Sequence, residues 1–176
     1  MPETARLSLR PLQKEDAPAL YRLTADPEVA RYMRFSTHTK PEQAAELIAE
    51  YTAPGCCAFA VFPKESGRFG GVFAFKPGEQ PEAYTLSIIL SPSLWNKGYA
   101  TELLTAMISH AESHLHGQTL TAYVVESNSG SRRVLEKCRF AVASVRTFPD
   151  FDDRLLVYVL SLKKNDSAAK ETSPHV

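Results

Sequence analysis

The residue types and spacing best suited to chemistry lie between Leu90 and Glu102, where the sequence is LSPSLWNKGYATE. A strand-like apolar run ends at Leu90, and a long amphipathic helical pattern begins near Gly98. The first N–H groups of a helix have no partner within it, and the helix dipole adds positive potential there, so this position suits a bound pyrophosphate. Gly98 has no side chain where a phosphate would approach most closely, and Ala100 keeps the next contact small.

Spacing alone does not identify this turn as a phosphate site, because glycine is also common in turns between a strand and a helix that bind nothing. The G-x-x-x-x-G-K-[ST] loop of phosphate-binding NTPases does not occur in the sequence. Of the three glycines in the dinucleotide-binding fingerprint, this turn has only one. A dinucleotide-binding enzyme is therefore retained only as a third alternative.

No metal site is predicted from the histidines and cysteines. His110 and His114 are four residues apart, as two ligands on one helix face can be, but no H-E-x-x-H motif or carboxylate partner accompanies them. Histidines in a last helical turn interact favourably with the helix dipole, which is the preferred explanation. The three cysteines form neither a disulfide framework nor zinc-ligand spacing and are expected to stay reduced; they are Cys56, Cys57 and Cys138.

Alternation and turn chemistry predict the elements that must position this loop. A helix is expected to open at residues 16–18 and to stop at Asp26-Pro27. Residues 39–42 match a capping box, and the helix behind it is expected to bury Ala45, Ile48 and Ala49. Strands are expected at residues 6–12, 57–62, 69–75 and 84–90, the last three as an antiparallel meander.

The second half of the chain changes to a crossover pattern. Residues 98–115 place apolar side chains on one helical face and lead into a strand at residues 119–125. Because strand, helix and strand follow one another here, the strands at 84–90 and 119–125 should be parallel and adjacent. The remaining elements expected are a helix at 129–137 and strands at 140–148 and 155–162, the strands joined by the acidic loop PDFDD.

Composition and charge fit one globular domain over residues 1–162, with a polar tail at residues 163–176 that is expected to be disordered. Of 176 residues, 20 are basic and 20 acidic, which argues against a large electrostatic footprint for nucleic acid or anionic membrane. The first residues lack the apolar core of a signal peptide, and no apolar run reaches the roughly 20 residues of a membrane-spanning helix. The chain is expected to be cytoplasmic, with no nucleic-acid or membrane partner.

Three motifs in order resemble the GNAT family of N-acetyltransferases, and the resemblance extends over residues 6–162. Residues 92–102 are PSLWNKGYATE, similar to the coenzyme A loop Pro-x-x-Trp-Gly-x-Gly-Tyr-Ala-Thr-Glu of the ribosomal-protein N-terminal (RimJ/RimL-like) branch. Residues 128–140 are NSGSRRVLEKCRF, similar to that branch's Asn-x-x-Ser-x-x-Val-Leu-Glu-Lys-x-Gly-Phe. Residues 26–33, DPEVARYM, match the branch in type and position.

Two residues depart from these motifs. Asn96 stands where the family has its first glycine, and Arg139 where the second motif has a glycine before Phe140. Asparagine tolerates left-handed backbone better than most residues, so Asn96 is expected to preserve the turn. Arg139 places the local path of the chain in question, because a helix C-terminus prefers glycine.

The resemblance implies an α/β GNAT fold, with a mixed, mostly antiparallel sheet of six or seven strands, one splayed parallel pair, and helices on both faces. It implies acetyl-CoA as co-substrate, its pantetheine arm lying between strands 84–90 and 119–125, and no metal. The implied cofactor contacts are the backbone of Ile88, Ile89 and Leu90, the amides of Lys97, Gly98, Tyr99, Ala100 and Thr101, and the side chains of Asn128, Ser131 and Arg132. Asn128 fits a helix N-cap equally well, and Lys97 fits a solvated surface lysine.

The resemblance also shows what this chain lacks for catalysis. Many relatives carry an acid at the position of Thr85 and a tyrosine at the position of Leu135, and neither is present here. Ser131 is the candidate for the group near sulfur, orienting the thiolate rather than fully protonating it. Three further residues are weak candidates for the general base, each better explained as a surface residue, so no base is assigned; they are His38, Glu82 and Glu126.

The function implied is transfer of an acetyl group from acetyl-CoA to a primary amine, with a protein N-terminus favoured over a small molecule. The acceptor is expected to contact residues 26–45 and 148–154, and a homodimer is a family-level expectation only. The alternative is a catalytically weak acyl-CoA-binding module for sensing or assembly, kept open by Thr85 and Leu135.

Overall fold

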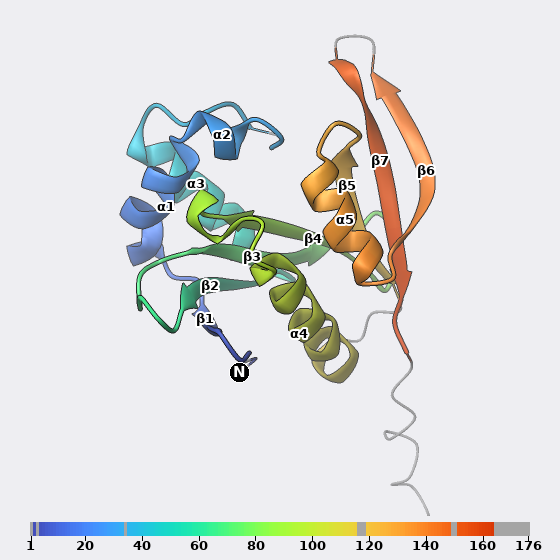
Figure 1. Ribbon diagram of the computed structural model, residues 1–176, viewed down its shortest axis with the longest axis horizontal. Helices are drawn as coiled ribbons and strands as arrows, with labels where there is room; N and C mark the ends of the chain where they lie inside the picture. The colour runs from blue at the N-terminus through green and yellow to red at the C-terminus, as the bar shows by residue number, and fades with distance from the viewer. Residues whose placement is uncertain (1, 3, 34, 116–118, 149–150, 164–176) are drawn as a thin grey trace, which may run out of the picture.

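The structure, a computed structural model, describes residues 2, 4–33, 35–115, 119–148 and 151–163 (Figure 1). The tail predicted to be disordered therefore lies outside the described residues from 164 onward. In chain order the elements are β1 (Leu7–Pro11), the 3-10 turn η1 (Lys14–Asp16), α1 (Ala17–Thr24), α2 (Pro27–Ala30), α3 (Pro41–Tyr51), β2 (Cys57–Pro63), β3 (Gly71–Pro77), β4 (Ala83–Leu90), the 3-10 turn η2 (Pro92–Leu94), α4 (Tyr99–His114), β5 (Thr119–Val125), α5 (Ser129–Lys137), β6 (Ala141–Phe148) and β7 (Phe151–Ser161).

Seven strands form one sheet in the order β1-β2-β3-β4-β5-β7-β6. Strands β2, β3 and β4 make the predicted antiparallel meander, and β4 pairs with β5 in parallel across the helical crossover α4. The predicted mixed, mostly antiparallel α/β sheet is confirmed. Among the described residues, no helix is both long and apolar enough to cross a bilayer.

The parallel pair is short. It covers three residue pairs, from Ala83 opposite Thr119 to Thr85 opposite Thr121. Beyond them β4 continues to Leu90 along β3, and β5 continues to Val125 along β7, with no further register between β4 and β5 in the described residues. Strand β4 stays paired with β3, and β5 stays paired with β7, while β4 and β5 separate from each other, so the sheet opens between β4 and β5. This opening is called the splay below.

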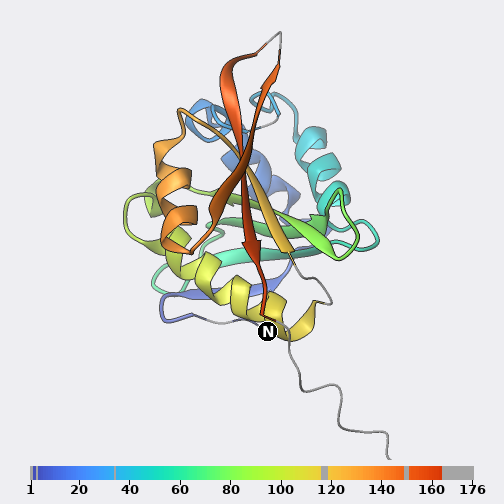
Figure 2. The ribbon, with the colours of Figure 1, turned by 90° about the vertical axis from the view of Figure 1, so that its right-hand side faces the viewer.

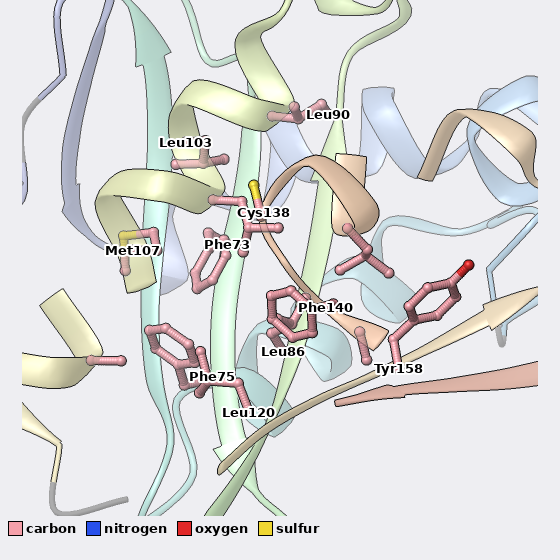
Figure 3. Packing of buried hydrophobic residues seen from close by; sticks show 14 of the residues in the cluster. Phe73, Phe75, Leu86, Leu90, Leu103, Met107, Leu120, Cys138, Phe140 and Tyr158 are labelled. Carbon is pink, nitrogen blue, oxygen red and sulfur yellow. The ribbon is translucent and has the colours of Figure 1, made fainter. Parts of the chain in front are cut away.

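Helices cover both faces of the sheet, as predicted (Figure 2). On one face, α4 packs Leu103, Leu104 and Met107 with α5 Leu135 against buried residues of β1 to β5 and β7 (Figure 3). On the other face, α1 and α3 cover β2, β3 and β4 with a second apolar cluster that includes Leu20. The second cluster contains no residue of β5, β6 or β7, so that half of the sheet lacks an apolar helical layer on this side among the described residues.

Helix α3 differs from its prediction in the face that it buries. The expected Ala45 and Ala49 are exposed, and the expected Ile48 is buried. The buried set follows the larger side chains, since burying them removes more apolar area from water: Ala44, Leu47, Ile48 and Tyr51. The helix start also differs, because Gln43 rather than the predicted Glu42 accepts hydrogen bonds from the backbone N–H groups of residues 39 and 40.

Helix α1 ends at Thr24, just before Asp26-Pro27, as expected. Two features that follow from capping and pairing were not predicted. The Asp26 carboxylate accepts from the Glu28 N–H and so begins the short helix α2. The acidic segment expected as a five-residue loop is mostly strand, because β7 already begins at Phe151, paired with Phe148. The residues between them, 149 and 150, lie outside the described part of the chain.

Arg139 keeps the chain path that glycine gives in relatives. Its φ is +68°, and two bonds close the end of α5: Arg139 N–H to the Glu136 carbonyl, and Phe140 N–H to the Leu135 carbonyl, each 3.0 Å. This is the left-handed helix end that usually selects glycine. A side chain in that conformation costs roughly 1–2 kcal/mol, so the fold is unchanged but the site is strained.

Replacing Arg139 by glycine is therefore expected to raise the free energy of unfolding by about 0.5–1 kcal/mol, the relief being partly offset by the more flexible unfolded chain. Urea unfolding followed by circular dichroism measures it. The matched control is Arg133→Gly at an exposed position in the middle of α5, which should lower stability by about 1 kcal/mol. A midpoint for Arg139→Gly at or below that of the unmodified chain would contradict the argument.

Candidate active site

The loop between β4 and α4 has the backbone of an anion-binding turn. Buried Leu94 anchors it, and Asn96 and Gly98 have φ values of +57° and +80°. Asn96 thus adopts the left-handed conformation expected from the sequence. Gly98 caps α4, its carbonyl accepting the first helical bond from Glu102 N–H at 3.0 Å. The amides that follow, from Tyr99 onward, belong to the first helical turn, where N–H groups lack helical partners.

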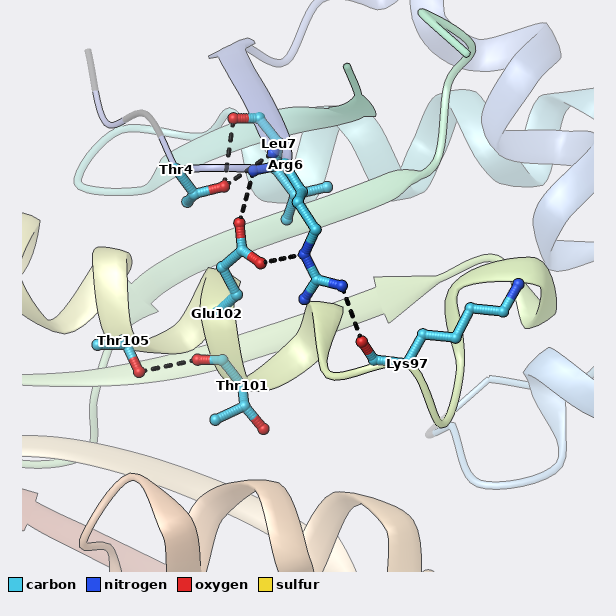
Figure 4. A network of polar contacts seen from close by, with 7 residues as sticks. All are labelled: Thr4, Arg6, Leu7, Lys97, Thr101, Glu102 and Thr105. Carbon is cyan, nitrogen blue, oxygen red and sulfur yellow. Dashed lines mark hydrogen bonds and ion pairs between the residues drawn. The ribbon is translucent and has the colours of Figure 1, made fainter. Parts of the chain in front are cut away.

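A salt bridge between Arg6 and Glu102 holds this loop from the other end of the chain (Figure 4). Glu102 Oε1 accepts from the Arg6 backbone N–H at 2.8 Å, and Oε2 accepts from Arg6 Nε at 2.6 Å. Arg6 Nη1 donates to the Lys97 carbonyl at 3.0 Å, and the guanidinium lies 4.1 Å from the centre of the Tyr99 ring. One arginine therefore joins the loop, its capped helix and the start of β1.

The contacts that Arg6 makes determine which polar groups of the loop are available to bind a ligand. The Lys97 carbonyl is turned to Arg6, so this acceptor is directed away from a neighbouring anion. The Lys97 ammonium donates to the Ser93 carbonyl at 2.8 Å and so closes the loop on itself. Burial acts to raise the pKa of Glu102, but hydrogen bonds from Thr4 and from the Arg6 backbone and guanidinium outweigh it and hold that pKa below its ordinary value.

The end of β4 turns alternate backbone groups toward the splay. The Ser91 N–H donates to the Gly70 carbonyl at 2.8 Å, and any side chain at Gly71 would collide with the Ile89 carbonyl oxygen, so residues 89 and 91 face β3. Because successive residues of a strand point their backbone groups to opposite sides, those of Ile88 and Leu90 face the splay. The Leu90 carbonyl is already bonded to Trp95 Nε1 at 2.8 Å.

The second helix start at the splay belongs to α5. Asn128 caps it, its Oδ1 accepting from the Ser131 N–H at 3.1 Å. Ser131 is half-buried in the first turn. Arg132 bends back so that Nη1 donates to the Glu126 carbonyl at 3.2 Å, and its buried Nε has no partner among the described residues. The sequence thus brings Asn128, Ser131 and Arg132 to one turn next to the end of β5.

Residues of β7 fix the loop that carries Asn128. Asp153 Oδ2 accepts from both the N–H and the hydroxyl of Ser127. Glu126 forms two bonds with Arg154, at 2.5 and 2.6 Å, and its N–H donates to the Arg154 carbonyl at 2.8 Å. The segment between β5 and α5 is therefore held to the start of β7 by Glu126 and Ser127, the two residues directly before Asn128.

The surroundings of the three weak base candidates assign none of them as the general base. His38 is buried, its Nδ1 lies 2.8 Å from the Thr24 hydroxyl, and burial lowers its pKa despite Glu46 nearby. Glu126 is paired with Arg154, and Glu82 is an exposed residue with φ +59° in the turn before β4. His38 ties the segment before α3 to the end of α1, which is a structural role.

The two positions that lack the family's acid and tyrosine have different surroundings. Thr85 is half-buried at the root of the splay, on the face opposite the larger core. Leu135 is 3% exposed and belongs to that core. Across the described residues, no group of three or more His, Cys, Asp or Glu side chains is arranged to hold a metal ion.

The contacts that hold the site in place could not be predicted from the sequence. Arg6 lies 96 residues from Glu102, and Asp153 lies 26 residues from Ser127. Neither pair has a local spacing signal, since such signals reach about four residues along a helix or two along a strand. A carboxylate in the first turn of α4 was visible at Glu102, but its partner was not.

A sheet opened between two parallel strands, with a helix start following each of them, is the arrangement expected of an α/β acyltransferase. The chain belongs to the GNAT family: residues 6–141 match the acetyltransferase (GNAT) domain. It is an acetyl-CoA-dependent N-acetyltransferase, which confirms the enzyme class predicted from the motifs.

A sequence relative and two solved structures agree with this assignment. The uncharacterized N-acetyltransferase p20 of Bacillus licheniformis is 28% identical over 172 residues, covering 94% of this chain and 97% of the relative. Spermidine N-acetyltransferase from Vibrio cholerae, solved with CoA and spermine, superimposes with a TM-score of 0.77 at 16% identity, covering 89% of this chain and 96% of that one. The Salmonella typhimurium enzyme that modifies the N-terminal serine of ribosomal protein L7/L12 gives a TM-score of 0.78 at 15% identity, covering 91% and 97%. At these identities the two structures establish the fold alone.

Removing the charge of Glu102 should lower stability in a pH-dependent way. Glu102→Gln loses the ionic part of its bonds to Arg6 and is expected to reduce the free energy of unfolding by about 1 kcal/mol at neutral pH. Because the folded-state pKa is lowered, the carboxylate stabilises the fold above its ordinary pKa of 4.5, and that contribution is lost as the pH falls through the lower folded value. Urea unfolding across this range should show the two proteins converging in acid. Glu65→Gln, on an exposed loop, is the control, and a pH-independent difference would refute the assignment.

Proposed function

We propose that this enzyme transfers the acetyl group of acetyl-CoA directly to a primary amine held over the root of the splay, and that a protein N-terminal amine is the first acceptor to test. The observation that carries the proposal is the separation of β4 from β5 after Thr85 and Thr121, directly before a capped helix start. Backbone groups that leave a sheet partner need another, and the extended pantetheine arm offers amides in matching orientation.

The cofactor contacts proposed follow from the two helix starts. The amides of Lys97 to Thr101 would hold the pyrophosphate, with the Arg6 guanidinium adding positive charge beside Gly98. The splay-facing backbone of Ile88 and Leu90 would pair with the pantetheine, whereas that of Ile89 is directed to β3. Asn128 and Arg132 would complete the site from α5.

The reaction forms a C–N bond between the neutral amine and the thioester carbon and breaks the C–S bond, whose electron pair leaves with the thiolate. An N–H of β4 that faces the splay can donate to the carbonyl oxygen as negative charge develops on it. Ser131 would orient the departing thiolate from the first turn of α5. No protein base is assigned, and positioning of the two reactants supplies much of the acceleration for an activated ester.

The preference for a protein N-terminal amine is supported by the motif resemblance, and a panel of different amines tests it. Structures similar to this chain include enzymes for a ribosomal-protein N-terminus and for spermidine, so both amine types belong in it. Thiol release from acetyl-CoA should be followed with peptides bearing free N-termini, polyamines and aminoglycosides. Turnover highest with peptides supports the proposal. Coenzyme A binding without turnover on any amine would instead favour an acyl-CoA-binding module.

Gly98 provides a test of the phosphate contact. Gly98→Ala places a methyl group where the pyrophosphate is proposed to lie, and should raise the KM for acetyl-CoA about tenfold. Gly67→Ala is the matched control, because Gly67 also has positive φ, +63°, but a Cβ there meets nothing within 4 Å. Both variants place an alanine at positive φ, so an equal change in both would remove the support for a phosphate site.

Ser131 provides a test of the sulfur contact. Ser131→Ala should lower kcat by about tenfold to hundredfold with little change in the KM for acetyl-CoA, because the thiolate develops only as the C–S bond breaks. Ser129→Ala, on an exposed serine two residues earlier in α5, should leave both constants unchanged. Steady-state thiol release measures both, and an unchanged kcat for Ser131→Ala would exclude Ser131 from the chemistry.

A further inference from the structure

The face of the splay opposite the larger core is polar and half-open. On β4 and β5 the residues Leu86, Ala122 and Val124 point into that core. Their neighbours along the strands point to the opposite face, and they are half-buried hydroxyl-bearing residues: Thr85, Ser87, Thr121 and Tyr123. An acceptor approaching from this face would therefore meet hydroxyl groups rather than packed apolar side chains.

Tyr123 lies at the level where the two strands have just separated. Thr85 pairs with Thr121 in the last register pair, so two residues further along each strand Ser87 and Tyr123 stand on either side of the opening. On the β4 side, the Ser87 hydroxyl lies 2.8 Å from Tyr51 Oη of α3, and that tyrosine is buried. On the β5 side, Tyr123 is only half-buried and can be reached from solvent.

Two charged residues orient the Tyr123 hydroxyl. Tyr123 Oη donates to Glu79 Oε1 at 2.8 Å. Arg146 on β6 donates to both oxygens of Glu79, at 3.1 Å each, and its guanidinium lies 5.3 Å from the centre of the Tyr123 ring. The network draws on the β3–β4 turn, β5 and β6, so three separate segments fix one hydroxyl group.

The direction of this hydrogen bond decides what the hydroxyl can do next. Burial, followed by the bond to Glu79, raises the pKa of Tyr123, so the phenol stays protonated near neutral pH. Its proton is committed to Glu79, and Arg146 also donates toward its oxygen, so one of the two oxygen lone pairs remains to accept from another donor. A primary amine is such a donor, with two N–H groups to spare while its own lone pair attacks carbon.

We propose that Tyr123 is an acceptor-binding residue: its oxygen accepts a hydrogen bond from the incoming primary amine and aims the amine nitrogen at the thioester above the root of the splay. Glu79 and Arg146 are positioning residues that act through the Tyr123 hydroxyl. Because Arg146 engages both carboxylate oxygens, Glu79 serves to orient the phenol, and the proton lost by the nitrogen leaves to water on this half-open face. The inference rests on the proposed function and adds the contact that selects the amine.

The test compares two tyrosine-to-phenylalanine variants on neighbouring strands, using the best amine from the panel above. Tyr123→Phe removes the hydroxyl but keeps the ring, and should raise the KM for the amine about fivefold to tenfold while leaving the KM for acetyl-CoA unchanged. Tyr84→Phe is the control, because Tyr84 on β4 packs against the larger core beside Phe75. Thermal unfolding of both variants establishes that each is folded.

Glu79→Ala separates a positioning role from a direct contact. Alone it should raise the amine KM by less than Tyr123→Phe does. Combined with Tyr123→Phe it should add nothing, because Glu79 acts through the hydroxyl that is already absent. Fully additive effects would show that Glu79 meets the amine itself and would overturn the assignment to Tyr123.

The outcomes distinguish this inference from the function on which it rests. If the unmodified enzyme releases thiol with an amine but Tyr123→Phe keeps the amine KM within twofold, the role of Tyr123 is overturned and acetyl transfer stands. If the unmodified enzyme binds coenzyme A and turns over no amine, the proposed function falls and the inference with it. A rise in both KM values together would indicate a structural role for Tyr123, which also overturns the proposal.

Discussion

The structure depends on the separation of two parallel strands after three residue pairs. A sheet interior normally satisfies every backbone N–H and carbonyl, so parting β4 from β5 leaves polar groups that must find other partners. The strands can part because each is held on its outer side, β4 along β3 and β5 along β7. Packing of α4 and α5 against the larger core keeps that geometry fixed. The opening is thus bordered on each side by a strand that stays paired with its outer neighbour, which is the geometry on which the proposed cofactor site depends.

Two long-range tethers place a helix start at each side of the splay. Arg6, from the start of β1, holds the loop before α4 through Glu102. Asp153, from β7, holds the loop before α5 through Ser127. Both tethers use charged groups on the surface, where each bond alone contributes modestly to stability. Both act on the loops that are proposed to contact the cofactor, so we expect them to matter more for cofactor binding than for stability.

Sequence reasoning recovered what is encoded locally. Periodicity and turn residues placed every strand and four of the helices within a few residues, and the crossover at residues 84–125 predicted the parallel pair. It failed where competing local signals needed three-dimensional context: the buried face of α3, the short helix α2 that Asp26 begins, and the start of β7 at Phe151. The left-handed Asn96 was predictable from its residue type. The partners of Glu102, Ser127 and Tyr123 were not, because residues far apart in the chain supply them.

The attachment of the Asn128 loop to β7 has a consequence for how such an enzyme can diverge. The hairpin of β6 and β7 supplies Asp153 and Arg154 to the loop before α5, and it also supplies Arg146 to the open face of the splay. One hairpin thus supports both the proposed cofactor site and the proposed acceptor site. If both proposals hold, a substitution in the hairpin that accommodates a new amine would also act on the α5 cap, so acceptor choice and cofactor binding would be expected to change together.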